Sequence, residues 1–551
     1  MRENRLVLSK LLIVYHKQRE GIMADKDNIN IMDSLKERDK IHFFDTTGLK
    51  QTIGIRDRCN SMYIEEKLSN RFQGEELRVL SVKINESGIY RKKTGIVMKL
   101  LGMGKPVQGL PPYCEVKVEH KTGKFSEHIT VWSPLAWNDR FAGTAGGGTG
   151  TGGDGYITAP NNTVRGWTLP FALINGFTAA MVDAGNVKER KDLMIDVNTR
   201  EFNWDLFENW RAGGTHYMTV IGKAVAEILH ERGVRFSYMN GGSGGGRQSM
   251  MEAQEYPEDY DGIWASCPAI NWTKFILAGL WPIAVMNSNR HILKHHKIKY
   301  FSSAVHQYAG GKETYFQLEQ KVDFNPDSVI GQNTKDGPIT EMDAHIMREI
   351  WKGPHRKNGE QLWYGFRPGI TFWNVILPVG AFYYSLLGKK PKPFFLVTSY
   401  LRWITRDPKQ VFDRVTLEEF EELYDKSITL FAKAAGDQAD LSVFAESGGK
   451  LIIDHGLNDP LIPVDGTIEY YDRMCRVLGG KEPVDKFCRL YLTPGDGHGN
   501  CWSDGPGITE ADGMKALMDW VENGKKPEAI RVVRVNKKTG ETLYEGVRTP
   551  V

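Results

Sequence analysis

The sequence lacks the features that mark metal-binding, membrane-spanning and nucleic-acid-binding chains. Its six cysteines form no C-x-x-C pair, so their spacing indicates no zinc site. No uninterrupted apolar run approaches the roughly 20 residues of a membrane-spanning helix. Lys and Arg total 71 against 68 Asp and Glu, and a net charge of +3 gives no reason to expect nucleic acid as a partner. What remains is an ordinary globular composition, 41% hydrophobic and 25% charged.

The amino terminus carries only a weak targeting signal. The first forty residues are polar and charged, and we expect residues 1–40 to form a disordered leader. The stretch "MRENRLVLSKLLIVYHKQRE" is faintly similar to a signal peptide, but Lys10 interrupts its apolar run and no A-x-A-like cleavage site follows. Met23 is a plausible natural start. The prediction is a cytoplasmic location, with secretion as the alternative.

A chain of 551 residues is too long for one simple core, and its pattern of apolar and aromatic residues changes twice along the chain. Alternating runs such as "LRVLSVKI" and "CEVKVEH" predict antiparallel strands, and strands then alternate with helices up to residue 271. Residues 272–447 are aromatic-rich and helical, after which the strand and helix alternation returns over 448–551. This order predicts an α/β domain with a mostly parallel sheet, built from 41–271 and 448–551 and interrupted by an inserted lid.

One serine stands among five glycines between a predicted strand and a predicted helix, in "YMNGGSGGGRQSMMEAQEYP". Gly241-Gly242-Ser243-Gly244-Gly245 fits G-x-S-x-G, the nucleophile elbow of α/β-hydrolases, in which a sharp turn exposes the serine. The following helix directs its first N–H groups toward an oxyanion that forms there. The sequence therefore predicts Ser243 as a nucleophile; the other interpretation is a plain tight turn.

A serine hydroxyl needs a base and an acid, and in this fold they follow the serine in the order acid, then histidine. "IIDHGLNDPLIP" places Asp459 in the loop after one strand, and "RLYLTPGDGHGNCW" places His498 in the loop after the next. Both loops lie at the carboxyl edge of a parallel sheet, where such sheets hold their sites. We predict these two residues as acid and base; the weaker rivals are His455, His216, Asp454 and Asp496.

A second glycine-rich stretch follows an earlier predicted strand. Between Gly143 and Gly155, "GTAGGGTGTGGDG" has eight glycines in thirteen residues. An esterase oxyanion hole takes one N–H from such a loop, and we expect Gly146, Gly147 and Gly148 to supply it together with Gly244. A phosphate-binding loop is the rival, but the GK[ST] ending is missing. A merely flexible loop is the remaining alternative.

With these segments in view, the chain resembles the tannase and feruloyl esterase family. The resemblance runs from about Leu110 to Trp520 and is carried by "WNDRFAGTAGGG", "THYMTVIGKAVAE", "FSYMNGGSGGGRQSMMEAQEYPEDYDGIWASCPAINWT" and "HGLNDPLIPVDGTIEYY". It implies an α/β-hydrolase with a large lid inserted before the acid and base strands, acting on esters of aromatic acids such as gallate and hydroxycinnamates. It assigns nucleophile, acid and base to the same three residues.

The chain departs from the family pattern at two places. Extracellular members carry a disulfide between cysteines beside the serine and the histidine, where this chain has Gly242 and Gly499. The lid of many relatives binds calcium through an aspartate-rich loop, which "SSAVHQYAGGKETYFQLEQKVDFNPDS" does not contain. The resemblance further matches Cys59 and Cys114 with an amino-terminal cysteine pair. No cofactor is expected.

The inserted block is rich in aromatic residues, most of which are expected to form its core. A few are expected to line the cleft, where flat walls suit a flat acyl group. Phe382, Arg402 and Trp403 are predicted substrate contacts. The resulting hypothesis is a serine carboxylesterase acting on small aromatic esters, with no nucleic-acid or membrane partner and no prediction of oligomeric state. A peptidase or amidase of the same fold, or a non-catalytic pseudo-hydrolase, are the alternatives.

Overall fold

The fold was analysed in a computed structural model of the chain. It describes residues 42–91, 106–148, 152, 168–185, 194–196, 198–311, 320–370, 393–498, 505–536 and 541–551. The expected leader, residues 1–40, lies outside these ranges. Among the described residues, no helix combines the length and apolar character that crossing a membrane requires.

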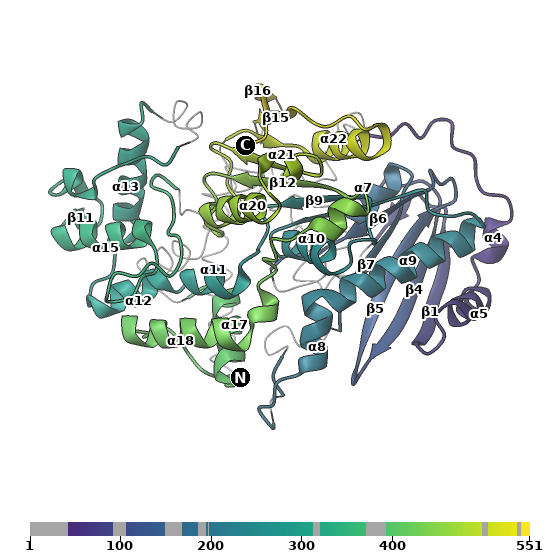
Figure 1. The fold of residues 1–551 in the computed structure, drawn as a ribbon, viewed down its shortest axis with the longest axis horizontal. Coiled ribbons are helices and arrows are strands. Elements are labelled where there is room, and N and C mark those ends of the chain that lie inside the picture. Colours follow the sequence, from purple (N-terminus) through teal and green to yellow (C-terminus); the bar gives the residue numbers. More distant parts are fainter. Residues whose placement is uncertain are drawn as a thin grey trace.

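A nine-stranded sheet runs through the centre of the molecule, in the order β1-β4-β5-β7-β6-β8-β9-β12-β13 (Figure 1). Pairs from β1 to β7 are antiparallel and pairs from β7 to β13 are parallel, as the alternating and then strand–helix sequence patterns predict. The strands are β1 (Glu76–Asn85), β4 (Tyr113–Thr122), β5 (Phe125–Pro134), β6 (Arg140–Thr144), β7 (Thr178–Val182), β8 (Phe236–Gly242), β9 (Gly262–Ser266), β12 (Lys450–Gly456) and β13 (Cys488–Thr493).

Helices cover both faces of this sheet because successive strand residues point to opposite sides. In β8, Met239 joins the apolar cluster on one face while Tyr238 joins the cluster on the other. The first face is covered by α5 (Ser61–Arg71), α9 (Gly214–His230), α10 (Gly244–Glu255) and α20 (Asp465–Val477). The second is covered by α7 (Leu169–Ile174) and α22 (Glu510–Asn523). The architecture is that of an α/β-hydrolase, as predicted.

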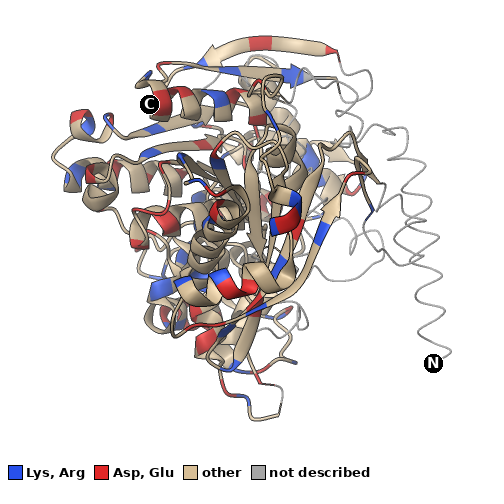
Figure 2. Ribbon diagram, turned by 90° about the vertical axis from the view of Figure 1, so that its right-hand side faces the viewer, with Lys and Arg blue, Asp and Glu red and all other residues tan. Residues whose placement is uncertain are grey.

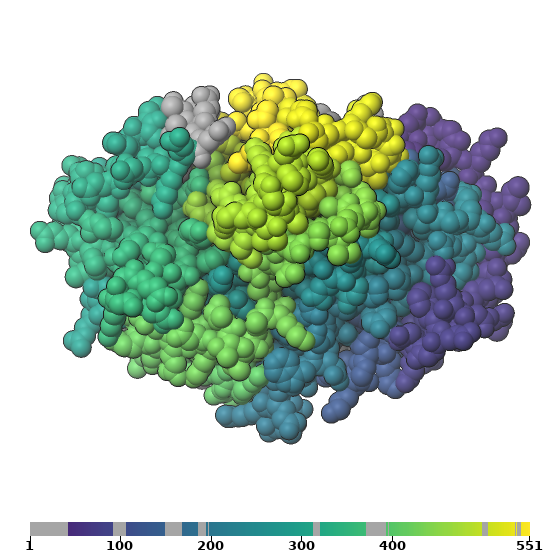
Figure 3. All heavy atoms as spheres, viewed as in Figure 1, coloured from purple at the N-terminus to yellow at the C-terminus, as the bar shows by residue number. Residues whose placement is uncertain are grey.

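Between β9 and β12 the chain forms a mainly helical block, which we call the inserted block; its aromatic core also includes Phe207 and Trp210 from before β8. It lies beside the sheet, in teal and green, away from the purple amino-terminal strands (Figures 1 and 3). The expected boundaries, which stay a prediction, fall at the first residue of its first helix and between its last helix and β12. Its helices are α11 (Trp272–Ala278), α12 (Trp281–Ser288), α13 (His295–Tyr308), α15 (Glu341–Lys352), α17 (Phe395–Thr405), α18 (Leu417–Leu430) and α19 (Ser442–Glu446).

The remaining described elements are short or lie at the carboxyl terminus. A three-stranded antiparallel sheet of β14, β15 and β16 follows the hydrolase strands. The sequence patterns do not predict it. These elements are α4 (Ile55–Arg58), β2 (Ile89–Tyr90), β3 (Val107–Gln108), α8 (Trp204–Glu208), the π-helix Asn209–Gly213, the 3-10 helices Pro326–Val329 and Ala432–Ala434, β10 (Asn333–Thr334), β11 (Gly337–Pro338), α21 (Lys481–Val484), β14 (Gly507–Ile508), β15 (Ile530–Val535) and β16 (Thr542–Arg548).

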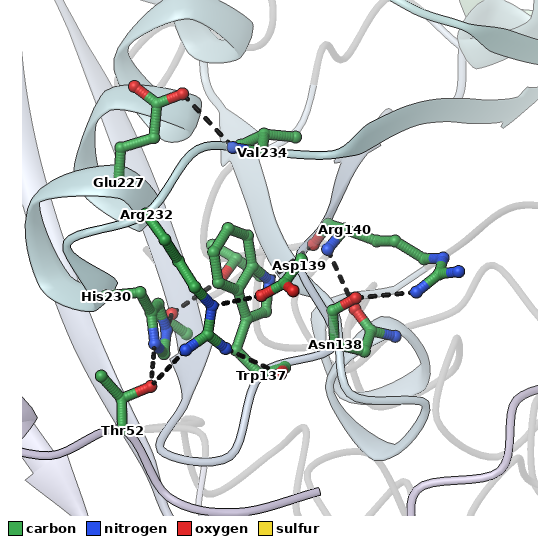
Figure 4. Close-up of polar contacts among 11 residues, drawn as sticks. Thr52, Trp137, Asn138, Asp139, Arg140, Glu227, His230, Arg232 and Val234 are labelled. Carbon is green, nitrogen blue, oxygen red and sulfur yellow. Dashed lines mark hydrogen bonds and ion pairs between the residues drawn. The ribbon is translucent and has the colours of Figure 1, made fainter.

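Helix α9 ends before it reaches Gly233, the next glycine in the chain. The helix ends at His230, and Glu231 adopts the left-handed conformation with φ 52°. The residues after it are held by a polar network at the amino edge of the parallel strands (Figure 4). There His230 Nδ1 lies 2.7 Å from Thr52 Oγ1, and Arg232 donates to the carbonyl of Trp137 and to Asp139. Side-chain bonds therefore fix this turn, and no glycine is needed.

Cys59 and Cys114 form a disulfide that ties the end of α4 to β4. Cys267, Cys475 and Cys488 are free. Lys and Arg (blue) and Asp and Glu (red) are interspersed along the elements, in keeping with the small net charge (Figure 2).

Candidate active site

A strained turn between β8 and α10 carries Ser243. Its φ of 62° and ψ of −122° lie in a region that side-chain-bearing residues rarely adopt, so the surroundings must hold it there. They do so through the main chain: the Ser243 N–H donates to the carbonyl of Ser266 at 3.0 Å, and its carbonyl accepts from Ala269 at 3.0 Å. A Cβ on Gly241 would lie 2.4 Å from the carbonyl oxygen of Gly245. Only glycine permits strand and helix to approach this closely.

The structure brings the three predicted side chains together at the carboxyl edge of the parallel strands. His498 Nε2 lies 2.8 Å from Ser243 Oγ, and His498 Nδ1 lies 2.7 Å from Asp459 Oδ2. Asp459 follows β12 and His498 follows β13, the neighbouring strand. These two contacts link the hydroxyl, the imidazole and the carboxylate in series, which is the arrangement that activates a serine nucleophile.

The carboxylate of Asp459 is almost fully buried and has donors on both oxygens. Its Oδ1 accepts the N–H groups of Leu461 at 2.7 Å and Ile462 at 3.0 Å. Its Oδ2 accepts from His498 and also faces His455 Nε2 at 3.0 Å, while His455 Nδ1 lies 2.9 Å from Thr467 Oγ1. A buried carboxylate with this many partners is both ionised and fixed in orientation.

Burial and charge act against each other at this pair. Burial alone raises the pKa of Asp459, but the charge of His498 and the hydrogen bonds from both histidines bring it well below its usual value. Burial alone lowers the pKa of His498, and the Asp459 charge outweighs this, so that the pKa rises well above the ordinary histidine value. The pair therefore favours the ionised carboxylate and stabilises an imidazolium, the state that follows proton transfer from a serine.

The expected oxyanion residues pack against the start of α10. A Cβ on Gly244 would lie 2.2 Å from the carbonyl oxygen of Gly148, and one on Gly245 would lie 2.7 Å from that of Gly146. Gly148 has a φ of 64°, a conformation that favours glycine. Gly147 lies between them in the same loop. The loop after β6 and the amino terminus of α10 thus approach each other beside Ser243.

Ser243 lines an apolar cavity that is open to solvent. Among the described residues, its side chains other than the serine are aromatic or aliphatic, and they come from the hydrolase domain and the inserted block together. The lining residues are Gly148, Ser243, Gly244, Ala269, Trp272, Phe275, Ile276, Gly279, Phe394, Leu396, Val397, Leu461 and Ile462. A cavity with this lining suits a small apolar or aromatic group next to the hydroxyl.

Of the predicted substrate contacts, the two that the structure describes, Arg402 and Trp403, do not line this cavity. Trp403 is only 2% exposed and packs against Trp210 of the π-helix Asn209–Gly213, so it is not among the described lining residues. Arg402 donates to the carbonyl of Gln410 and is likewise not among them. Phe382 lies outside the described residues. The aromatic pattern could not separate core from cavity, because the helices present aromatic residues to both.

The rival candidates have other partners. His216 Nδ1 lies 2.7 Å from Asp259, and Asp454 accepts the indole N–H of Trp264 at 2.7 Å. Asp496 accepts at its carbonyl from Asn458 at 2.9 Å. None of these contacts involves Ser243.

Two residues beside the site have contacts that the sequence analysis did not predict. His455, one of the weaker rivals for the base, is instead the second histidine on Asp459. Cys267 follows β9, is 2% exposed, and brings its sulfur within 4.8 Å of Asp459 and His498 ligand atoms. In the described part of the chain, this is the one group of three His, Cys, Asp or Glu side chains spaced closely enough to hold a metal ion.

The sheet, the turn at Ser243 and the three hydrogen-bonded side chains define the class of the protein, which is an α/β-hydrolase. The sequence pattern of the family described as Tannase and feruloyl esterase matches residues 114–549, and the chain belongs to this family. It is accordingly a carboxylic ester hydrolase.

Relatives and solved structures agree with this assignment. A probable feruloyl esterase of Arthroderma benhamiae is 32% identical over 437 residues, 76% of this chain and 77% of that protein. A mono(2-hydroxyethyl) terephthalate hydrolase of Piscinibacter sakaiensis is 26% identical over 489 residues, 76% and 78%. The crystal structure of feruloyl esterase B from Aspergillus oryzae matches with a TM-score of 0.71 at 18% identity, covering 90% of this chain and 95% of that one. Tannin acyl hydrolase from Aspergillus niger gives 0.72 at 17%, covering 91% and 93%.

Proposed function

We propose that the protein is a serine esterase that hydrolyses esters of small aromatic acids through an acyl-enzyme. The observation that supports this most directly is the 2.8 Å contact between His498 Nε2 and Ser243 Oγ at the mouth of an apolar cavity. The names of similar proteins point the same way, since feruloyl, terephthalate and tannin esters all carry aromatic acyl groups.

The first half-reaction forms the acyl-enzyme. Ser243 Oγ attacks the ester carbonyl while His498 Nε2 takes the hydroxyl proton, and Asp459 stabilises the resulting imidazolium. N–H groups from Gly244 and from the loop that contains Gly148 stabilise the negative oxygen of the tetrahedral intermediate. The intermediate collapses as His498 gives its proton to the departing alcohol.

Water then completes the reaction. His498 removes a proton from water, the hydroxide attacks the acyl carbonyl, and the second tetrahedral intermediate releases the acid while Ser243 regains its proton. Each step moves a proton between groups of this chain, the substrate and water, and no cofactor takes part.

The cavity walls supply the preference for the acyl group. Trp272 and Phe275 offer flat aromatic surface, and Ile276, Leu461 and Ile462 offer aliphatic surface. A flat ring with few polar substituents gains the most from such walls, because each buried hydroxyl without a partner costs free energy. We therefore expect cinnamoyl and feruloyl esters to be preferred over galloyl esters, whose ring carries three hydroxyls.

A panel of methyl esters tests the proposal with the alcohol held constant. Methyl cinnamate, methyl ferulate, methyl gallate and methyl butyrate are compared by kcat/KM, and we expect the first two to be the best substrates. A fluorophosphonate probe should label the wild-type protein and leave Ser243→Ala unlabelled. Equal labelling of Ser243→Ala would overturn the nucleophile assignment, and a preference for the butyrate would overturn the aromatic acyl group.

A further inference from the structure

Main-chain hydrogen bonds fix Cys267 beside the catalytic residues. Its N–H donates to the carbonyl of Asp454 at 2.7 Å, and the carbonyl of the preceding Ser266 accepts from Ser243. The φ of Cys267 is 35°, in the left-handed region. The loop is therefore fixed on both sides of Cys267, which gives the thiol a defined position. The proposed esterase reaction does not use this thiol.

The thiol completes a cluster of three different ligand types. The sulfur of Cys267, a carboxylate oxygen of Asp459 and a ring nitrogen of His498 all lie within 4.8 Å of one another, and all three residues are buried. Sequence spacing alone indicates no zinc site, because these residues are far apart in the chain and only the sheet edge assembles them. The contact with Cys267 also contributes to the raised pKa of His498, after the larger effect of Asp459.

Thiolate, imidazole and carboxylate are the ligands that zinc takes in proteins. A tetrahedral zinc ion, with bonds of about 2.0–2.3 Å, needs its ligand atoms roughly 3.3–3.6 Å apart, so the three side chains must shift by about 1 Å relative to one another to hold the ion. His498 contacts Ser243, which lines the cavity. A fourth coordination position remains for water.

We propose that Cys267, Asp459 and His498 form an inhibitory site for Zn²⁺ and similar thiophilic divalent cations. On binding, the Cys267 thiol loses its proton to solvent and the imidazole nitrogen that takes the metal can no longer serve catalysis. Coordination at Nδ1 removes the bond to Asp459, and coordination at Nε2 removes the bond to Ser243. Either mode stops the esterase. Binding weakens as the pH falls, because protons compete for the same ligand atoms.

Metal binding is measured first without any assay of activity. Equilibrium dialysis with Zn²⁺ gives the stoichiometry, and Co²⁺ serves as the spectroscopic probe because a thiolate ligand gives it a charge-transfer band in the near ultraviolet. We expect the band in the wild type, its loss in Cys267→Ala and Cys267→Ser, and its retention in Cys475→Ser, in which a different free thiol is removed. This result does not depend on the proposed substrate.

Inhibition is measured second, with each variant compared with its own metal-free rate. Zn²⁺ should inhibit the wild type and Cys475→Ser reversibly, with recovery on adding EDTA. Removal of the thiol ligand should raise the half-inhibitory concentration at least about tenfold. Inhibition of Cys267→Ser at the wild-type concentration, or a cobalt spectrum unchanged by that substitution, would overturn the site. A wild type that binds neither metal would overturn it as well.

Discussion

At the residue scale, the site depends on how the protein keeps one buried carboxylate ionised. Asp459 has no solvent to stabilise its charge, and the N–H groups of Leu461 and Ile462 together with two histidines take that place. Hydrogen bonds to a charged group are worth about 1.5–3 kcal/mol each. The chemistry of His498 is therefore set by its neighbours as much as by the imidazole itself.

The first prediction concerns pH. His498 can accept the Ser243 proton only when neutral, and its pKa is raised by Asp459, so kcat/KM should rise with pH through a midpoint above the usual histidine value of about 6.5. Asp459→Asn removes the charge, so the midpoint should move to lower pH and kcat should fall by about three to four orders of magnitude. The matched control is Asp472→Asn, on an exposed part of α20. A midpoint that stays in place in Asp459→Asn would contradict the electrostatic coupling.

A second prediction separates the role of His455 from simple packing. His455→Leu removes the second histidine contact to Asp459 and should lower kcat by about 10- to 100-fold with little change in KM, because the lost bond fixes the acid and does not touch substrate. His455→Gln restores an N–H donor and should recover part of the loss. Steady-state kinetics with one methyl ester measure both variants. Equal activities of Leu and Gln variants would mean that the hydrogen bond contributes nothing.

The same residues show which parts of the site could be predicted from the sequence. Ser243, Asp459 and His498 could be proposed because each follows a strand, and strand ends of a parallel sheet share an edge. Cys267 and His455 could not be assigned, because their contacts depend on the exact approach of loops distant in the chain. Trp403 shows the limit for the inserted block: an aromatic run does not reveal which side of a helix faces the cavity.

At the element scale, the strained turn from β8 to α10 places the Ser243 hydroxyl at the cavity. Strands and helices of the hydrolase domain were predictable from their periodicity, since buried strands and amphipathic helices leave distinct patterns. The end of α9 was not, because Glu231 takes a conformation that sequence rules assign to glycine and side-chain bonds around Arg232 hold it. The carboxyl-terminal sheet of β14, β15 and β16 also escaped prediction.

The third prediction tests how closely β8 and α10 must approach. Gly241→Ala places a methyl group 2.4 Å from a backbone carbonyl oxygen that cannot move away alone, so the elbow must shift. A displacement of about 1 Å at a nucleophile costs about 100-fold in rate, and we expect that loss in kcat. Gly233→Ala is the control, since a Cβ there meets nothing within 4 Å. Thermal unfolding of both variants establishes that the protein still folds, and full activity of Gly241→Ala would contradict the close-packing argument.

At the scale of the whole molecule, the Cys59–Cys114 disulfide joins the amino-terminal helices to the antiparallel side of the sheet, far along the strand order from β8, β12 and β13. A disulfide is more typical of the alternative prediction, secretion, than of a cytoplasmic location, because disulfides persist mainly in oxidising compartments. Neither cysteine contacts the candidate site, so stability and catalysis should respond separately to its loss.

The final prediction makes this separation measurable. The disulfide closes a loop with a sequence separation of 55 residues, and removing such a cross-link costs about 2–4 kcal/mol of the free energy of unfolding. Cys59→Ser, or the wild type treated with a reductant, should therefore unfold at a lower temperature, while kcat/KM and its pH midpoint stay at the wild-type values below that temperature. Cys475→Ser, which removes a free thiol, should leave the unfolding temperature nearly unchanged. A wild-type protein whose unfolding is insensitive to reductant, and whose denatured form gives no additional thiols after reduction, would show that the two sulfurs are not bonded. A loss of catalysis that exceeds the loss of folded protein would instead show that the amino-terminal helices support the site through the sheet.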